Sequence, residues 1–196
     1  MSRNSRAYAE RHLALLKVFL NWEAEISYSL EFGDTTAKYQ VHDRPHPTDK
    51  ALKELTRTKV IKLQRIRYKT SKIGTLGGIQ LEFANMTGSA FYQTSETGFN
   101  FRTVDIDTSR TIDKVSMKTT SKTGDEDEVQ ITAIKFTDKD DGNILDLNFS
   151  NDEPQGTWTT YQIPLGHEIV GLRAKKDKGQ GLRRLGLLLW IPNPED

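Results

Sequence analysis

The sequence contains no cysteine among its 196 residues. Disulfide bonds, thiolate zinc sites and cysteine nucleophiles are therefore excluded. The absence of cysteine also fits a reducing compartment. The apolar run at residues 13–20 contains Lys17, and no small-residue cleavage site follows it, so no signal peptide is predicted. We expect an intracellular, cytoplasmic protein.

An excess of charge of one sign is lacking too, since the net charge is only +1. Overall charge therefore predicts no nucleic-acid partner. The longest apolar run, at residues 185–191, is far too short to span a membrane. The sequence has no HExxH, no GxSxG, no phosphate-binding loop and no dinucleotide fingerprint. We expect neither an enzyme nor a cofactor.

An amphipathic helix is predicted near the start of the chain. Residues 7–22 are rich in good helix formers and contain no glycine or proline. The broad apolar face of this helix includes Leu15, Leu16, Phe19 and Trp22. Two interpretations remain open, because such a helix either packs on its own domain or docks against a partner.

A strand pair and a proline-containing loop are predicted next. Residues 25–32 alternate apolar and polar side chains, which is typical of a half-buried strand, and residues 37–41 are expected to pair back with them. Two prolines then make residues 42–48 a loop. We assign residues 1–58 to the helix, strand pair and loop, and residues 59–196 to a β domain.

Three hairpins of one plan recur in the β domain, at residues 66–83, 115–136 and 169–190. Each has an alternating strand, a polar turn rich in lysine or glycine, and a second strand that ends in a large apolar residue. Their starts lie about 50 residues apart. With the weaker strands between them, they predict three four-stranded units that bury their inner faces against one another. Strand pairs at irregular intervals in an ordinary all-β chain are the alternative.

The strand of the first hairpin shows an irregular pattern. Its apolar phase slips between Leu63 and Ile66, which predicts a β-bulge. The face opposite its apolar residues is expected to carry Arg65, Arg67 and Lys69.

Three stretches of the β domain resemble the jacalin-related lectins. The motif LxxIxY at residues 63–68 is similar to an early strand of that family, and VxI through Phe at residues 129–136 is similar to a middle strand. EIVGL followed by GxxLxxLG, over residues 168–186, resembles the family's closing hairpin. The resemblance covers about residues 60–191. It implies a mostly β, three-sheet β-prism, or a related β-sandwich, to which the N-terminal helix and strand pair are added.

The resemblance also implies where sugar would bind, and this chain departs from that pattern. The family's closing hairpin carries a Gly-x-x-x-Asp segment whose carboxylate accepts hydrogen bonds from sugar hydroxyls. Gly179 aligns with the glycine, but Arg183 stands in place of the aspartate. Arginine donates and cannot accept, so it cannot replace that carboxylate.

The closing turn and its neighbours are strongly basic. They form the hypothetical ligand- or partner-binding set Arg173, Lys175, Lys176, Lys178, Gly179, Arg183 and Arg184. An acidic protein surface is the partner that such a patch favours, and the acidic turn at residues 122–128 of a second copy is one candidate. Solvated turns with protective charges are the favoured interpretation, because no nucleic-acid-binding motif accompanies the patch.

Residues 138–143 (DKDDGN) have the composition of a calcium loop. The spacing is wrong for an EF-hand, because the glycine comes fifth and position twelve is Phe149. A hairpin turn at Asp141-Gly142 is the favoured interpretation, with a loose calcium site as the alternative. Two histidines in the proline-containing loop fit a solvated loop better than a metal site.

These observations predict a non-catalytic protein-interaction or assembly module. The helix and the basic turn would contact a protein partner or a second copy of the chain. The alternative is a carbohydrate-binding lectin whose site differs from the usual Gly-x-x-x-Asp. A binder of acidic polymers ranks below both.

Overall fold

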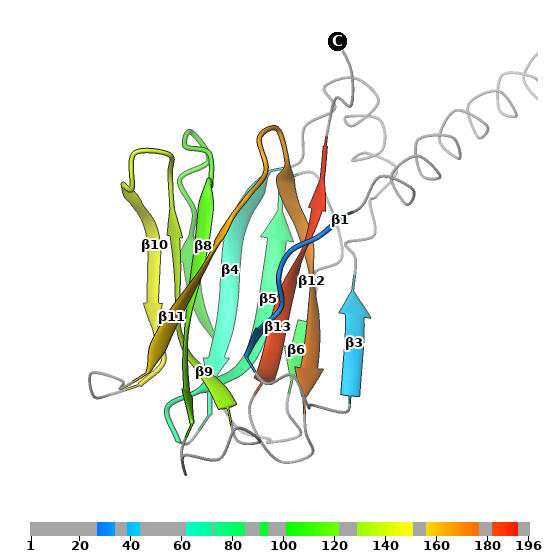
Figure 1. Ribbon diagram of the computed structural model, residues 1–196, viewed down its shortest axis with the longest axis vertical. Coiled ribbons are helices and arrows are strands. Elements are labelled where there is room, and N and C mark those ends of the chain that lie inside the picture. Colours follow the sequence, from blue (N-terminus) through cyan, green and yellow to red (C-terminus); the bar gives the residue numbers. More distant parts are fainter. Residues whose placement is uncertain are drawn as a thin grey trace, which may run out of the picture.

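The computed structural model describes residues 27–33, 39–43, 62–71, 73–84, 91–93, 101–121, 129–150, 156–176 and 182–191. Within these ranges every regular element is a strand, and the strands form three antiparallel sheets (Figure 1). The prediction of a mostly β chain with three sheets is confirmed. The predicted helix at residues 7–22 lies outside the described residues. Over the described ranges, no helix has the length and apolar character that crossing a membrane requires.

Two of the sheets have the same strand order. The first sheet consists of β4 (Leu63–Thr70), β5 (Leu76–Phe83), β6 (Phe91–Gln93) and β7 (Arg102–Asp105), in the order β6-β5-β4-β7. The second consists of β8 (Lys114–Ser121), β9 (Val129–Thr137), β10 (Asn143–Asn148) and β11 (Thr157–Gln162), in the order β10-β9-β8-β11. In each sheet a hairpin supplies the two central strands, and the next two strands pair with its outer edges.

The third sheet repeats this plan with strands from the N-terminal segment. Its central hairpin is β12 (Glu168–Lys176) and β13 (Leu182–Trp190). β1 (Ser27–Tyr28) and β2 (Phe32–Gly33) pair with β13, whereas β3 (Tyr39–Asp43) pairs with β12. We expected the N-terminal strands to pair with each other; instead they satisfy the backbone groups on opposite edges of the hairpin. The three predicted hairpin-based units are therefore confirmed, except that among the described residues the third sheet has five strands and not four.

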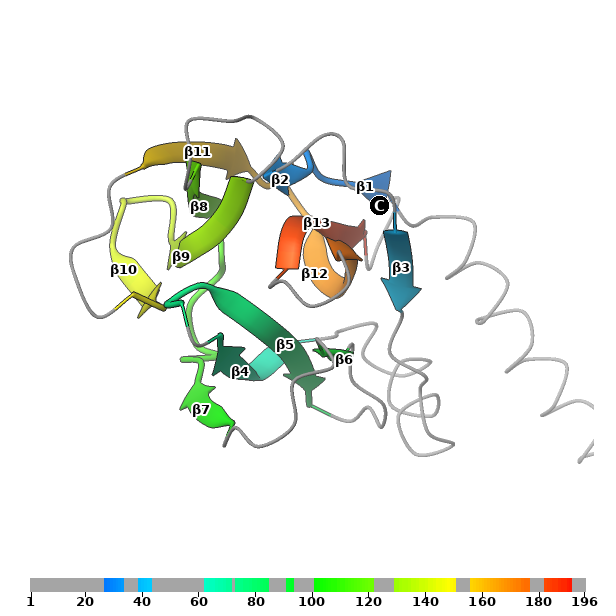
Figure 2. The same ribbon diagram turned by 90° about the horizontal axis from the view of Figure 1, so that it is seen from below.

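The three sheets surround one core, as the view along the strands shows (Figure 2). Each hairpin turns one apolar face inward, because alternate residues of a strand face opposite sides. Ile66 of the first sheet, Met117 of the second and Leu185 of the third are all fully buried. The rings of Tyr68 and Phe149 pack 5.3 Å apart between their centroids, so side chains of the first two sheets interlock.

The irregularity predicted for β4 is present, and the lysine of this strand is buried. The pairing of β4 with β5 shifts register between Leu63 and Arg65, which confirms the bulge. Lys69, predicted on the face opposite the apolar residues, is only 2% exposed, so other parts of the protein cover it. A second register shift follows between Lys69 and Thr70, just before the turn.

Candidate functional site

The two ends of the sheet assembly are distinguished by the strands that begin or end there. A small pocket is lined by residues from the start of β4, from the segment before β8 and from the start of β12, so these three points lie at one end. The last residues of β4, β8 and β12 therefore lie at the opposite end (Figure 1). The predicted basic turn follows β12 in the sequence, and residues 177–181 lie outside the described residues.

The structure divides the predicted basic set into separate groups. Lys178 and Gly179 lie outside the described residues, and Lys175 and Lys176 are placed in β12 by their backbone alone. Arg183 lies in β13 with only 7% of its surface exposed. A side chain buried to this degree does not present its guanidinium to a ligand in the turn.

Arg173 and Arg184, two further members of the set, are joined to each other by Glu31. Arg173 Nε lies 3.1 Å from Glu31 Oε1, and Arg184 Nε contacts the other carboxylate oxygen. The side chain of Glu31 is 11% exposed and both arginines are 19% exposed, so the three charges are largely removed from water. Glu31 therefore neutralises part of the predicted basic surface from within the chain.

The segment around Ser29 completes this contact. Ser29 N donates to Leu187 O at 3.1 Å, and Leu187 N donates to Ser29 Oγ at 2.8 Å. Arg173 Nη2 also donates to Ser29 O at 3.1 Å. Gly186 makes room, because a Cβ there would lie 2.9 Å from Arg173 Nε and 3.2 Å from Glu31 Cγ. Through these contacts Ser29 and Glu31 attach the N-terminal segment to β12 and β13.

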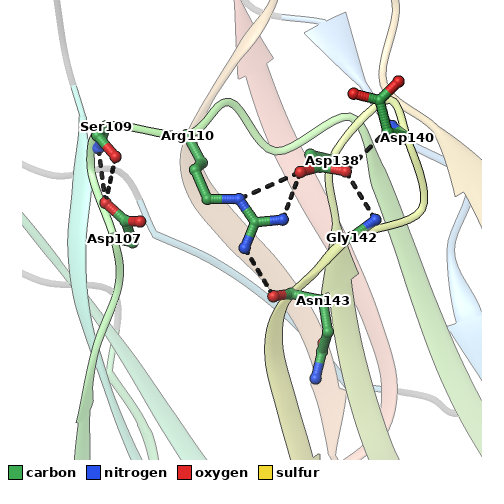
Figure 3. A network of polar contacts seen from close by, with 7 residues as sticks. All are labelled: Asp107, Ser109, Arg110, Asp138, Asp140, Gly142 and Asn143. Carbon is green, nitrogen blue, oxygen red and sulfur yellow. Dashed lines mark hydrogen bonds and ion pairs between the residues drawn. The ribbon is translucent and has the colours of Figure 1, made fainter.

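The suspected calcium loop forms a tight turn around its own first aspartate (Figure 3). Asp138 Oδ1 accepts hydrogen bonds from Gly142 N at 2.7 Å and from Asp140 N at 3.0 Å. Asp138 N donates to Gly142 O at 3.0 Å, which confirms the hairpin-turn interpretation. Asp141, with φ of 60°, occupies the left-handed region that such turns use.

Arg110 supplies a cation to the same carboxylate. Its Nε lies 3.1 Å from Asp138 Oδ2, which Nη2 also contacts, and its Nη1 donates to Asn143 O at 2.8 Å. The hydrogen bond from Arg110 is the main reason that the pKa of Asp138 is lowered. Nearby, the hydroxyl and backbone N–H of Ser109 lower the pKa of Asp107. Among the described residues, no group of three histidine, aspartate or glutamate side chains is placed to hold a metal ion.

The pocket beside this turn contains Glu168, and burial disfavours the charged form of this residue. Its polar lining residues include Lys62, Thr108, Arg110 and Glu168. Lys62 Nζ donates to Thr108 O at 2.9 Å. Burial raises the pKa of Glu168 above its ordinary value of 4.5, and the charge of Lys62 opposes this shift only in part.

The Glu168→Gln variant should be more stable than the native chain at neutral pH. A raised pKa means that the folded state resists ionisation, so the native chain loses stability as pH rises from the ordinary value of 4.5 through the higher folded-state value. The advantage of Glu168→Gln should shrink to nothing below that range, where Glu168 is protonated in both states. Thermal unfolding at a series of pH values measures the difference in stability between Glu168→Gln and the native chain, with Asp140→Asn in the exposed turn as control. An advantage that does not depend on pH would contradict the expectation.

An exposed tryptophan on the outer face of the second sheet escaped the sequence analysis. Trp158 is 43% exposed, and Lys118 Nζ lies 5.8 Å from the centroid of its ring. Beside them, the hydroxyls of Ser116 and Thr160 are 2.7 Å apart. A signal was present in the sequence, because residues 158 and 161 of one strand must face opposite sides. Tyr161 packs against the core, so Trp158 must point away from it.

Comparison with known proteins gives similarity in structure only. No family model and no curated protein matches the sequence. Frutalin from Artocarpus incisa superposes with a TM-score of 0.58 at 17% identity, over 85% of this chain and 97% of that chain. This chain has the β-prism fold. The resemblance to jacalin-related lectins seen in the sequence is thus confirmed for the architecture.

Two further β-prisms show how wide this similarity is. A mannose-specific jacalin-related lectin from Morus nigra, solved in complex with mannose, has a TM-score of 0.57 at 13% identity and covers 85% of this chain and 96% of its own. The second β-prism domain of RbmC from V. cholerae has a TM-score of 0.52 at 16% identity, over 82% of this chain and 98% of its own. At these identities the similarity establishes the fold, and the binding residues must be argued from this chain itself.

Proposed function

We propose that this β-prism chain is a non-catalytic carbohydrate-binding protein. The observation that carries the proposal is the extent of the structural match, since nearly the full length of several lectins superposes on this chain. Two of the similar structures were solved with mannose or mannotriose bound. The similarity favours the carbohydrate-binding alternative over the assembly module and offers no support for the latter.

The site proposed here differs from the usual one of the family. The sequence resemblance aligns Arg183 with the sugar-binding aspartate of the jacalin-related lectins, and the side chain of Arg183 is buried in β13. Sugar hydroxyls need acceptors as well as donors, and arginine supplies donors only. Any sugar bound by this chain must therefore be held by other groups.

The full chain applied to an array of immobilised glycans is expected to retain a subset of them. Binding should persist in a chelating buffer, because the Asp138 carboxylate of the suspected calcium loop is already engaged by Arg110 and by two backbone N–H groups. Free saccharide of the retained type should displace the chain, and heat-denatured protein is the control. Retention of no glycan, with or without calcium, would refute the proposed function.

The assembly module stays a prediction that rests on residues beyond the described ranges. The helix face made by Leu15, Leu16, Phe19 and Trp22 and the turn residues Lys178 and Gly179 belong to those parts of the chain. The domain boundary at residue 58 likewise stays a proposal, although β1, β2 and β3 pair with the closing hairpin.

A further inference from the structure

We propose that the outer face of the second sheet binds a carboxylate-bearing sugar unit, with Trp158 as the stacking surface and Lys118 as the charge partner. This inference rests on the proposed function and gives it a place and a ligand class. The place is the β8–β11 strand pair, in which β11 is the edge strand (Figure 2). It is not the closing hairpin turn that the family resemblance indicates.

The pairing of β8 with β11 brings the relevant side chains together. Trp158 lies directly opposite Lys118, and Thr160 lies directly opposite Ser116. Residues opposite each other in an antiparallel pair project from the same face. The intervening Met117 is fully buried on the inner face, so these four side chains project outward.

The indole of Trp158 has the chemistry to stack on a sugar ring. The face of an aromatic ring carries partial negative charge, and one face of a pyranose presents C–H groups with partial positive charge. Lys118 contacts the ring at a centroid distance of 5.8 Å, yet 43% of the Trp158 surface stays exposed for a ligand.

Hydroxyl groups next to the indole can bind the polar edge of the same sugar. Ser116 Oγ and Thr160 Oγ1 share one hydrogen bond of 2.7 Å, which uses only one of their two protons. The second proton and the remaining lone pairs are free to bond a ligand. An aromatic surface bordered by hydroxyls is therefore present on a rigid strand pair.

The charge beside the indole favours an acidic ligand. On the same face, Lys135 lies opposite Ser116 on β9, but the exposed Asp146 lies opposite Lys135 on β10, so Lys118 is the cation that carries this preference. Over the described ranges, Lys118 has the Trp158 ring as its contact and forms no ion pair, whereas the nearby Lys114 pairs with Asp141 at 2.6 Å. A sugar carboxylate would complement Lys118 while its ring covers the indole.

Binding of oligosaccharides to the full chain and to matched variants tests this inference. The probes are oligosaccharides terminated by glucuronic acid, by sialic acid, or by neutral glucose or galactose, which distinguish the two sources of carboxylate. The variants are Trp158→Ala, Lys118→Met and Lys118→Arg. Lys118→Met keeps an apolar side chain over the indole, and Lys118→Arg keeps the positive charge. Lys139→Met, in the exposed turn after β9, is the control for loss of one positive charge.

The native chain is expected to bind at least one acidic probe about tenfold more tightly than the neutral ones, a difference of about 1.4 kcal/mol. Trp158→Ala should weaken binding of every probe about tenfold. Lys118→Met should abolish the preference for acidic probes, Lys118→Arg should retain it, and Lys139→Met should change nothing.

The outcomes separate the two proposals. If the native chain binds saccharides while Trp158→Ala and Lys118→Met bind like the native chain, the site is refuted and the proposed function stands. If Trp158→Ala weakens binding but no acidic preference exists, the ligand class is refuted. If the native chain binds no saccharide at all, the site and the proposed function are both refuted.

Discussion

Glu31→Ala is expected to lower the free energy of unfolding by about 3 kcal/mol. The substitution leaves the guanidinium groups of Arg173 and Arg184 close together on the third sheet without the carboxylate that both contact. Removing one partner of a largely buried ion pair is costly, because the remaining charge keeps its desolvation penalty and loses its compensation. Here a single carboxylate compensates two such charges.

Chemical denaturation measures the loss, and a second glutamate of the same chain provides the matched control. Glu82 also lies near two arginines, at 3.4 Å from Arg65 and 3.6 Å from Arg67, but all three side chains are more exposed. Glu82→Ala should therefore cost much less than Glu31→Ala, as exposed ion pairs do. Equal losses of unfolding free energy for the two variants would mean that the burial of the Glu31 contact does not increase its contribution to stability.

Gly33→Ala is expected to lower the free energy of unfolding by about 3 kcal/mol, through two separate effects. Gly33 has φ of 99°, a conformation that strains any residue with a Cβ. A Cβ at this position would also collide with the backbone carbonyl oxygen of Arg183 on the paired strand β13. The chain would have to move β2 away from β13 to relieve this contact.

Gly166→Ala separates these two effects. Gly166 has φ of 79°, so it shares the backbone strain, but nothing lies within 4 Å of a Cβ placed there. It should cost only about 1–2 kcal/mol in chemical denaturation. If Gly33→Ala costs no more than Gly166→Ala, the close approach of β2 to β13 is not required for stability.

Local patterns were sufficient to predict the repeating part of the fold. The three hairpins were predicted because inward-facing residues alternate with polar ones and because lysine- and glycine-rich turns interrupt them. The bulge beside Leu63 was predicted for the same reason, since a slip in the apolar phase is visible within a few residues. The burial of Lys69 was not predicted, because the alternation of residues along a strand does not show which other segments cover its outer face.

The sequence predicted the candidate sites less well than the fold. The sequence indicated a basic cluster around the closing turn, but charges near one another in the chain need not share a surface. Arg183 is buried, and Arg173 and Arg184 are held by Glu31, more than 140 residues earlier in the chain. Conversely, Trp158 and Lys118 are distant in sequence and meet only because β11 pairs with β8.

The order of apolar and polar residues alone was enough to specify strands, turns and the threefold repetition of hairpins, because each depends on neighbours within about ten residues. The amino-acid composition likewise ruled out cysteine chemistry before any fold was known. Only the tertiary structure decided that strands from the N-terminal segment complete the third sheet, and that Arg110 occupies the carboxylate of the suspected calcium loop. These contacts join residues far apart in the chain, and their geometry follows from how the sheets pack.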